Sequence, residues 1–389
     1  MTDVVNPTNG FILLISWSVL AGVWWLIATV LVFVGPRRKR NESGSAHHPV
    51  TVFKPIPPVR DETEQQLLAG AIESFISQLE RDDELLIGVD QRELSGWEGV
   101  FNNWRSRWPD AQIVIVAQAE PRQLSNPKVA WMQVLSAKAH NDAWLWSDAD
   151  VIVEPGFLRT LRNALNDQEA SAVTAAYAVR HVNKPAAMFD ALFVNVEFLP
   201  GALLLERIGS TEFAYGAAIL FRARTFRERV DWADLGARLA DDHELGRRLR
   251  PVKVLDAVVS TFTLPGSWGD ALKHYYRWQK TVRWCRPAGY AALILVIPLA
   301  GWAIAVAISA GGQMFAAGFL GQWLFEILVC TVICLRIGCR LPPLTWPGLM
   351  LWPLVRMIAW MLAWLPLPVV WGRREAAWSA PTKPAGIGL

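Results

Sequence analysis

Two stretches of the 389-residue chain are apolar over lengths that suit a lipid bilayer, and they lie near its two ends. The first, residues 11–34, contains no charge and exceeds the roughly 20 residues that a helix needs to cross the hydrocarbon. The basic run Arg37-Arg38-Lys39-Arg40 follows it, whereas a cleaved signal peptide has its basic residues first. Basic clusters stay in the cytoplasm, so we expect a signal anchor at 1–36 with its N-terminus outside and a basic, polar linker at 37–49.

The second apolar region fills the C-terminal part of the chain. Residues 288–325 carry no charge, and Gly311-Gly312-Gln313 provides a turn between two spanning helices. A third block, residues 344–371, has basic residues on both sides, which leaves its sidedness open. Prolines interrupt that block, which is either one kinked span or a re-entrant pair of half-helices. We therefore expect a membrane bundle at 288–372 and a polar tail at 373–389.

Between these regions, residues 50–287 alternate short apolar runs with amphipathic patterns. Apolar positions three and four residues apart predict helices around 68–79 and, after Pro155, around 158–165. Short strands alternating with helices predict a mostly parallel α/β sheet in a cytoplasmic domain. The usual glycine motifs for dinucleotides and phosphate loops are absent from the sequence. The strand-like runs are 51–56, 84–90, 111–117, 143–147 and 171–178.

The composition agrees with a membrane protein that carries a globular domain. Charged residues make up 19% of the chain and hydrophobic residues 52%, where soluble domains average about 25% charge. The 21 tryptophans suit membrane interfaces. A net charge of +3 gives no electrostatic reason to expect nucleic acid as a partner. The four cysteines form no CxxC pair, so we expect neither a zinc site nor structural disulfides.

The strongest chemical signal is a pair of carboxylates, Asp148 and Asp150, directly after the apolar run Trp144-Leu145-Trp146-Ser147. Ligands of open α/β sheets gather at the carboxyl ends of strands, and carboxylate oxygens there suit Mg²⁺ or Mn²⁺ bound to phosphates. Asp90 and Lys54-Pro55 end two other strand-like runs, so we expect them at the same edge. The acidic pair could instead be a solvated turn, and Asp90 taken alone could be an ordinary turn residue.

Two later clusters could serve the same site. Asp241-Asp242-His243-Glu244 gathers three acids around one histidine, although acids also favour the first turn of any helix. Residues 274–286 are dense in basic and aromatic side chains just before the C-terminal apolar region. Such a stretch commonly anchors a helix at the membrane surface, and arginine also binds diphosphates through two parallel hydrogen bonds.

Taken in order, these segments resemble the GT-A glycosyltransferases of family 2 and of the lipid-acting family 21, which includes ceramide glucosyltransferases and hopanoid-biosynthesis glycosyltransferases. The likeness covers nearly the whole chain. Residues 195–200 and 213–217 also look like the acceptor-side region of the bacterial members. The matching motifs are Lys54-Pro55, Asp90, Asn126-Pro127-Lys128, Asp148-Ala149-Asp150, Asp241-Asp242-His243 and, for the (Q/R)xxRW motif, His274 with Arg277-Trp278.

Two positions depart from the family pattern. His274 stands where Gln or Arg is common, and a shifted register, Gln279 with Arg283-Trp284, has one residue too many. We favour the register that ends in Arg277-Trp278. His243 stands where an aromatic residue is usual, which affects the acceptor preference rather than the chemistry.

The resemblance implies a GT-A fold, a Rossmann-like mixed sheet, joined to N-terminal and C-terminal transmembrane helices. It implies inverting transfer of a sugar from a UDP-sugar to a lipid hydroxyl, with glucose and ceramide as the favoured pair. Asp242 would be the general base, and Asp148 and Asp150 would hold Mg²⁺ or Mn²⁺. The other implied roles are nucleotide-sugar binding (Lys54, Asp90, Lys128, Asp148, Asp150, Arg277, Trp278) and contact with the acceptor (Asp241, His243, His274).

Other functions stay open at this point. Transfer of N-acetylglucosamine to a hopanoid is the chief alternative within the family. A processive polysaccharide synthase shares the acidic motifs but needs more spanning helices, and a polyprenyl-phosphate sugar transferase does not need the HxxRW segment. A membrane scaffold would explain the helices but not the ordered charged clusters. We expect a multi-pass protein of a bacterial inner membrane, surrounded by membrane lipids, with its catalytic domain in the cytoplasm.

Overall fold

The structure is a computed structural model that describes residues 7–36, 48–166, 170–182, 184–209, 212–263, 267–308, 312–371 and 374–375. The basic run at 37–40, most of the polar linker, Gly311 of the predicted turn and nearly all of the predicted tail lie outside these residues. The chain forms two compact units. The helical unit comprises Met1–Gly35, Val179–Gly201 and Thr263–Ala376, and the sheet unit comprises Pro36–Ala178 and Ala202–Phe262.

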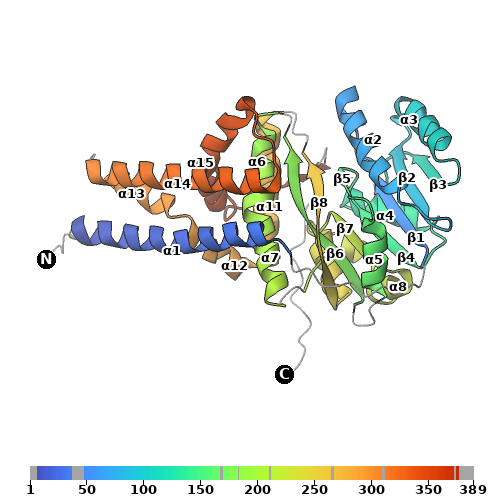
Figure 1. The fold of residues 1–389 in the computed structure, drawn as a ribbon, viewed down its shortest axis with the longest axis horizontal. Helices are drawn as coiled ribbons and strands as arrows, with labels where there is room; N and C mark the ends of the chain where they lie inside the picture. Colours follow the sequence, from blue (N-terminus) through green and yellow to red (C-terminus); the bar gives the residue numbers. More distant parts are fainter. Residues whose placement is uncertain are drawn as a thin grey trace, which may run out of the picture. The chain divides into compact units, whose positions relative to one another are not determined.

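The sheet unit is built on an eight-stranded mixed sheet with the order β3-β2-β1-β4-β7-β6-β8-β5 (Figure 1). Strands β1 to β4 pair with one another in parallel, β7 is antiparallel to β4 and β6, and β8 is antiparallel to β5. This arrangement confirms the predicted Rossmann-like mixed sheet. The strands are β1 (Val50–Pro55), β2 (Glu84–Asp90), β3 (Gln112–Gln118), β4 (Ala143–Ser147), β5 (Val151–Ile152), β6 (Ala172–His181), β7 (Ala218–Arg222) and β8 (Val252–Phe262).

Local chemistry marks the starts of two helices of the sheet unit. Asp61 caps α2 by accepting a hydrogen bond from the backbone N–H of Glu64, and the apolar face of α2 is buried. The residue before α5 has a left-handed backbone conformation, with φ +86°. This residue is Gly156, and glycine adopts that conformation at little cost. The helices are α2 (Glu62–Ile76), α3 (Leu94–Arg107), α4 (Pro127–Ser136), α5 (Phe157–Leu165), α8 (Ala223–Arg229), α9 (Trp232–Gly236) and α10 (Asp241–Arg248).

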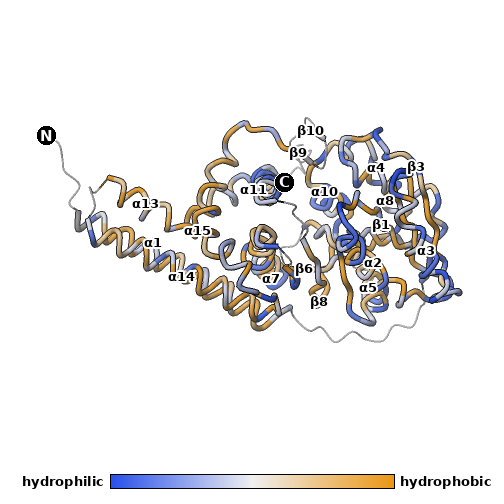
Figure 2. Tube along the Cα trace, turned by 90° about the horizontal axis from the view of Figure 1, so that it is seen from above, coloured by the Kyte–Doolittle hydropathy of each residue, from blue (hydrophilic) through white to orange (hydrophobic). Residues whose placement is uncertain are grey.

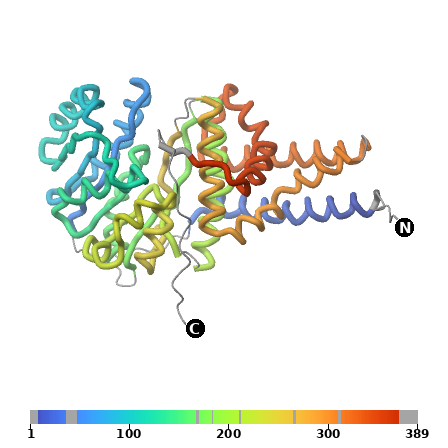
Figure 3. The backbone as a smooth tube through the Cα atoms, turned by 180° about the vertical axis from the view of Figure 1, so that it is seen from behind, coloured from blue at the N-terminus to red at the C-terminus, as the bar shows by residue number. Residues whose placement is uncertain are grey.

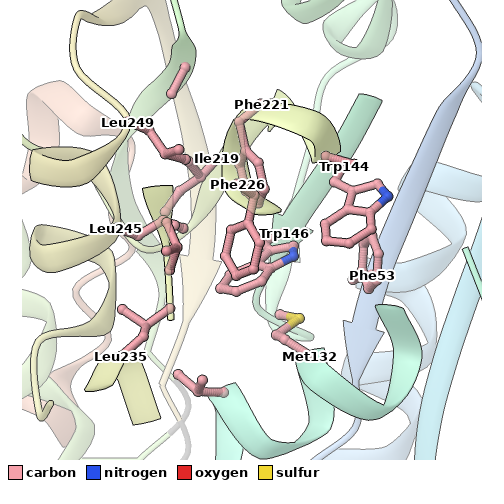
Figure 4. Close-up of a cluster of buried hydrophobic side chains, with 14 of the residues drawn as sticks. Phe53, Met132, Trp144, Trp146, Ile219, Phe221, Phe226, Leu235, Leu245 and Leu249 are labelled. Atoms are coloured by element: carbon pink, nitrogen blue, oxygen red, sulfur yellow. The ribbon is translucent and has the colours of Figure 1, made fainter. Parts of the chain in front are cut away.

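Large aromatic side chains hold the centre of the sheet. Trp144 and Trp146 of β4 are both buried, and Figure 4 shows them beside Phe53, Phe221 and Phe226. The ring of Trp144 lies 5.4 Å from that of Phe53, and the ring of Trp146 lies 5.4 Å from that of Phe221. Edge-to-face pairs of this kind add to the stabilisation from apolar burial. The core therefore fixes β4 firmly, and with it the acidic residues that follow.

The helical unit contains the long apolar helices, which Figure 2 colours as hydrophobic. By length and composition the candidate membrane spans are Asn9–Val34, Ala187–Arg207 and Gln313–Ile337, and a pair bent by 62° (Pro287–Val296 with Leu299–Ile308) could add one more. The first agrees with the span expected at 11–34, whereas no span was expected at Ala187–Arg207. The elements that lie wholly or in part in this unit are α1 (Pro7–Val34), α6 (Ala187–Leu192), η1 (Phe193–Phe198), α7 (Leu199–Arg207), α11 (Trp268–Cys285), α12 (Pro287–Ala292), η2 (Leu293–Val296), α13 (Leu299–Ile308), α14 (Gln313–Ile337), η3 (Pro343–Thr345), α15 (Trp346–Leu362), β9 (Val370–Trp371) and β10 (Arg374–Glu375).

A buried ionic cluster joins several of these helices. The guanidinium of Arg356 lies 2.7 Å from Glu197 and 3.6 Å from Glu326, and it stands over the ring of Trp25. Gln322 donates a hydrogen bond to Glu326 one helical turn away. The cluster thus ties together α1, η1, α14 and α15; α1 and α14 run side by side in Figures 1 and 3. Glu326, which is an isolated acid in an apolar helix by sequence, is paired within the protein.

Candidate active site

The two carboxylates of the Asp148-Ala149-Asp150 turn, which follows β4 directly, are partly buried. The antiparallel pairing of β5 with β8 brings Thr261 opposite Val151, and the Thr261 hydroxyl donates a 2.8 Å hydrogen bond to Asp150. Burial and the neighbouring negative charge of Asp148 raise the pKa of Asp150 to about 6. The turn therefore holds two acids whose mutual repulsion a cation would relieve.

Lys54, at the end of β1, lies beneath this turn and is fully buried. Its ammonium donates hydrogen bonds to the hydroxyl of Ser147 (2.9 Å) and to the backbone carbonyl of Asp148 (2.6 Å). Burial lowers the pKa of Lys54 to about 7, although the charges of Asp150 and Asp148 oppose this shift. The contacts of Lys54 are thus with the backbone and hydroxyl groups that shape the acidic turn.

Lys128 connects the acidic turn with the third acidic motif. It lies in the first turn of α4, which Asn126 caps, and its ammonium is 2.6 Å from Asp148 and 3.6 Å from Asp241. The side-chain amide of Asn126 also donates a hydrogen bond to Asp241 at 3.2 Å. Although burial disfavours its charge, the carboxylates of Asp148 and Asp241 raise the pKa of Lys128. The sheet unit therefore brings three of the predicted motifs into one charged cluster.

Asp242 lies in the first turn of α10, and its side chain is half-buried. The backbone N–H of His243 donates a 2.8 Å hydrogen bond to it, and a Cβ atom on Gly216 would lie only 3.0 Å from its other oxygen. Burial and the charge of Asp241 raise the pKa of Asp242 to about 6, while the charge of Lys128 opposes the shift. A carboxylate with this pKa can accept a proton near neutral pH.

His243 and Asp90 have other partners. The His243 ring lies 5.1 Å from that of Phe213, in the segment 213–217 that the sequence analysis associated with the acceptor. Asp90, at the end of β2, accepts hydrogen bonds from the Arg92 guanidinium at 3.0 and 2.7 Å. These bonds lower the pKa of Asp90 to about 2. Because β1 separates β2 from β4, Asp90 is not on the strand next to the acidic turn.

The predicted HxxRW residues lie on α11 of the helical unit. The His274 ring is 4.1 Å from the ring of Trp278, which stacks on Phe193 at 4.6 Å. Gln279, by contrast, is buried and hydrogen-bonded to Glu197 and Tyr290. The side chain of Gln279 is thus occupied inside the helical unit, and the register His274 to Trp278 stays a prediction.

A comparison with protein-family models agrees with the order of the motifs and with the mixed sheet. Residues 13–379 match the family model described as glycosyl transferase family 21. The chain belongs to glycosyl transferase family 21. Among curated proteins, none matches this family 21 chain by sequence.

One solved structure similar to this family 21 chain is described as the crystal structure of GalNAc-T7 with UDP, GalNAc and Mn²⁺. The two share 11% sequence identity with a TM-score of 0.41, and the match covers 63% of this chain. The chain spans about half of that protein, since the match covers 51% of it.

A divalent cation fits the acidic turn of this family 21 chain. Among the residues that the structure describes, no group of three or more His, Cys, Asp or Glu side chains could hold a metal ion by itself. Asp148 and Asp150 would supply two carboxylate ligands to such a cation, and phosphate oxygens and water would supply the rest. The raised pKa of Asp150 agrees with this arrangement, because like charges that crowd together are stabilised by a cation.

Tyr177 is a residue of this family 21 chain that the sequence analysis missed. It lies on β6, and besides burial the charges of Asp242, Asp148 and Asp150 raise the pKa of its phenol. Its side chain is therefore close enough to both acidic motifs to be influenced by all three carboxylates. The sequence signal for Tyr177 was weak. Alanines flank it in an apolar strand, and the hydroxyl of a buried tyrosine usually has a polar partner.

Proposed function

We propose that this family 21 protein is an inverting glycosyltransferase that moves glucose from UDP-glucose to the hydroxyl of ceramide. The observation that supports this function best is the charged cluster of the sheet unit, in which Lys128 bridges Asp148 and Asp241. Family membership supports the transferase chemistry, and the candidate membrane spans of the helical unit support a lipid acceptor. N-acetylglucosamine and a hopanoid form the alternative donor and acceptor pair.

In this mechanism Asp242 is the general base. The acceptor hydroxyl gives its proton to the Asp242 carboxylate while its oxygen forms a bond to the anomeric carbon, and the bond from that carbon to the UDP oxygen breaks. Attack on the face opposite to the leaving group inverts the anomeric configuration. The half-burial of Asp242 keeps its pKa near 6, so it is ionised and still basic at pH 7.

The departing UDP gains negative charge, and several residues of the chain are suited to stabilise it. A divalent cation held by Asp148 and Asp150 would supply Lewis-acid stabilisation of the diphosphate. The Lys128 ammonium is paired with the Asp148 carboxylate, and Lys54 holds the turn from below through Ser147 and the Asp148 carbonyl. Arg277 is a permanent cation that suits bidentate phosphate contact.

The remaining residues divide between the two substrates. We assign Asp90 to the nucleotide, and Trp278 to packing against the donor sugar. Asp241, His243 and His274 are assigned to the acceptor region. This assignment places the protein in a membrane with the sheet unit in the cytoplasm, where UDP-sugars are made.

Radiolabelled transfer tests this function directly. Purified full-length protein in lipid nanodiscs is incubated with UDP-[¹⁴C]glucose or UDP-[¹⁴C]N-acetylglucosamine and with nanodiscs that contain ceramide, a hydroxylated hopanoid or neither lipid. We expect label in ceramide, identified by mass spectrometry of the product, and a β-linkage from an α-linked donor. Label in a hopanoid selects the alternative pair, label in a polymer selects a polysaccharide synthase, and no label in any acceptor rejects the transferase proposal.

A further inference from the structure

A buried carboxylate stands against the motif helix of the helical unit. Asp190 of α6 is 1% exposed, and one of its oxygens lies 2.8 Å from Nδ1 of His274. The other oxygen has no hydrogen-bond partner among the residues that the structure describes. Burial of a carboxylate is costly unless it is paired, and ionisable residues within long apolar helices usually have a functional reason. Asp190 therefore requires an explanation that packing does not give.

The partner of Asp190 distinguishes it from Glu197 and Glu326, two other acids in this unit. Glu197 and Glu326 both face the guanidinium of Arg356. Asp190 instead pairs with an imidazole, whose side chain remains 31% exposed. An acid that served only to stabilise the helix bundle would be expected to meet a permanent cation as its neighbours do.

The His274 ring is fixed on two sides. Asp190 pairs with Nδ1 on one side. On the other side the centroid of the Trp278 ring lies 4.1 Å from that of the His274 ring, and Trp278 stacks on Phe193. Because an ionised carboxylate only accepts hydrogen bonds, Asp190 selects the tautomer with its proton on Nδ1, and in that tautomer Nε2 offers a lone pair. A hydroxyl can donate to that lone pair, whereas a phosphate oxygen cannot. The pair is therefore suited to a hydroxyl ligand.

We propose that Asp190 is a positioning residue that orients His274 so that Nε2 accepts a hydrogen bond from a hydroxyl of the lipid head group. The proposal rests on the function proposed above, and it concerns recognition of the acceptor, while proton transfer stays with Asp242. The pair belongs to the unit that also contains the candidate membrane spans, which is where a lipid would be held. Asp190 does not touch the lipid and acts through His274.

The test measures acceptor and donor binding separately in the full-length protein. Wild type, Asp190→Asn, His274→Ala and the double variant are immobilised, and retention of radiolabelled ceramide or hydroxylated hopanoid is measured beside binding of UDP-glucose. We expect Asp190→Asn to weaken lipid binding about tenfold, the scale of one lost hydrogen bond to a polarised group. UDP-glucose affinity should stay unchanged. In transfer assays the acceptor KM should rise by the same factor as the lipid affinity falls.

The double variant separates positioning from a structural role. If Asp190 acts through His274, the change of Asp190→Asn in the His274→Ala background should cost nothing further. A further loss of lipid affinity in the double variant would overturn the proposal. Unchanged lipid affinity in Asp190→Asn, or a wild type that binds neither lipid, would also overturn it. Glu326→Gln, which removes another buried acid of the same unit, is the matched control and should keep full lipid affinity.

Two further outcomes are decisive. If Asp190→Asn lowers the melting temperature, His274→Ala tests the same pair through a partly exposed side chain. That variant should show the same loss of lipid affinity with unchanged UDP-glucose affinity. If the wild type binds lipid but transfers no sugar, the proposed function fails while the binding role of the pair can still be scored. A selective loss of UDP-glucose affinity would assign the pair to the donor and reject the proposal.

Discussion

The ammonium of Lys128 lies 2.6 Å from a carboxylate oxygen of Asp148, so a cation of the chain is paired with the first acid of the acidic turn. The same ammonium faces Asp241, and its charge opposes the rise in the pKa of Asp242. Lys128 therefore couples the two acidic motifs electrostatically. Its removal should change the base as well as the turn.

We predict that Lys128→Met moves the acid limb of the kcat/KM profile to higher pH. Without the ammonium, nothing at this position opposes the effects of burial and Asp241, so the pKa of Asp242 rises above about 6. The variant should lose more activity at pH 6 than at pH 8. Lys128→Arg keeps the charge and is the control; an acid limb that stays in place in Lys128→Met contradicts the coupling.

The wild-type pH dependence follows from the same group. The base must be ionised, so kcat/KM should fall as the pH drops through about 6 and level off above about 7. Asp150 has a raised pKa in the same range, so the limb reports the two acids together rather than either alone. Initial rates between pH 5 and 8 at a lipid concentration below KM would measure it. A rate that rises toward acid pH excludes a carboxylate base.

Asp242→Asn should lower kcat by about 10²-fold or more, the usual scale for general base catalysis. The amide keeps the shape and the hydrogen bond from the backbone of His243 but cannot accept the proton. UDP-glucose affinity, measured by equilibrium binding, should stay within about twofold because the base acts on the acceptor. Near-normal turnover would move the role to Asp241 or Glu244.

Asp150→Asn and chelation test the cation. Each should abolish transfer, and Mg²⁺ or Mn²⁺ should restore the chelated wild type but not the variant, since the amide is a weaker ligand. Calorimetric titration of Mn²⁺ with UDP gives a readout besides activity. Thr261→Val, which removes only the hydroxyl that donates to Asp150, is the milder comparison. Full activity after exhaustive chelation would leave the phosphate charge to the lysines and arginines.

Arg277 and Arg283 should differ in their tolerance of lysine. Arg283 donates to the backbone carbonyl of Trp364 and stands over its ring, contacts that a lysine partly reproduces. Arg277→Lys loses the planar fork and should cut turnover at least about tenfold, or ~1.4 kcal/mol of transition-state stabilisation. The two variants are compared in one transfer assay. If Arg283→Lys is the more damaging, the motif register His274 to Trp278 is wrong.

The ionic cluster of the helical unit predicts unequal effects of its members on stability. Glu326→Gln keeps a polar group beside Gln322 and Arg356 and should leave transfer activity largely intact. Arg356→Met leaves Glu197 and Glu326 without their cation and should destabilise the protein by about 3–5 kcal/mol. Thermal unfolding in one detergent compares them. A large loss of turnover in a normally stable Glu326→Gln protein would instead connect Glu326 with the acceptor.

Local sequence patterns predicted the parts of the fold that depend on local chemistry. The strands expected at 84–90 and 143–147 are β2 and β4. Short continuous apolar runs between polar turns are typical of buried strands. The antiparallel strand β7 was missed, which is why the pattern suggested a mostly parallel sheet, whereas the family resemblance correctly implied a mixed one. A five-residue strand among alanines and aromatics has no distinctive period.

Contacts between distant residues could not be predicted from local patterns. The strand-end position of Lys54 predicted its place at the edge of the acidic turn but not its burial, and Asp190 meets His274 across 84 positions of sequence. Neither the burial nor the pairing leaves a periodic signal, since each depends on how separate elements pack. The segment Ala187–Arg207 was missed as a candidate span because Asp190, Asn195 and Glu197 interrupt its apolar run.

The pairing of Glu326 with Arg356 has a consequence for how the chain enters a membrane during synthesis. The two charges lie on consecutive helices, α14 and α15, and each alone would cost about 2.5–3.5 kcal/mol in hydrocarbon on insertion scales. Were α15 to enter the hydrocarbon alone, Arg356 would be unpaired, whereas a hairpin of α14 and α15 brings its own counter-charge. Glu197, which is synthesised earlier, lies 2.7 Å from the same guanidinium in the folded protein. The C-terminal helices should therefore integrate as a pair, and a chain that ends before Arg356 should leave α14 only partly inserted.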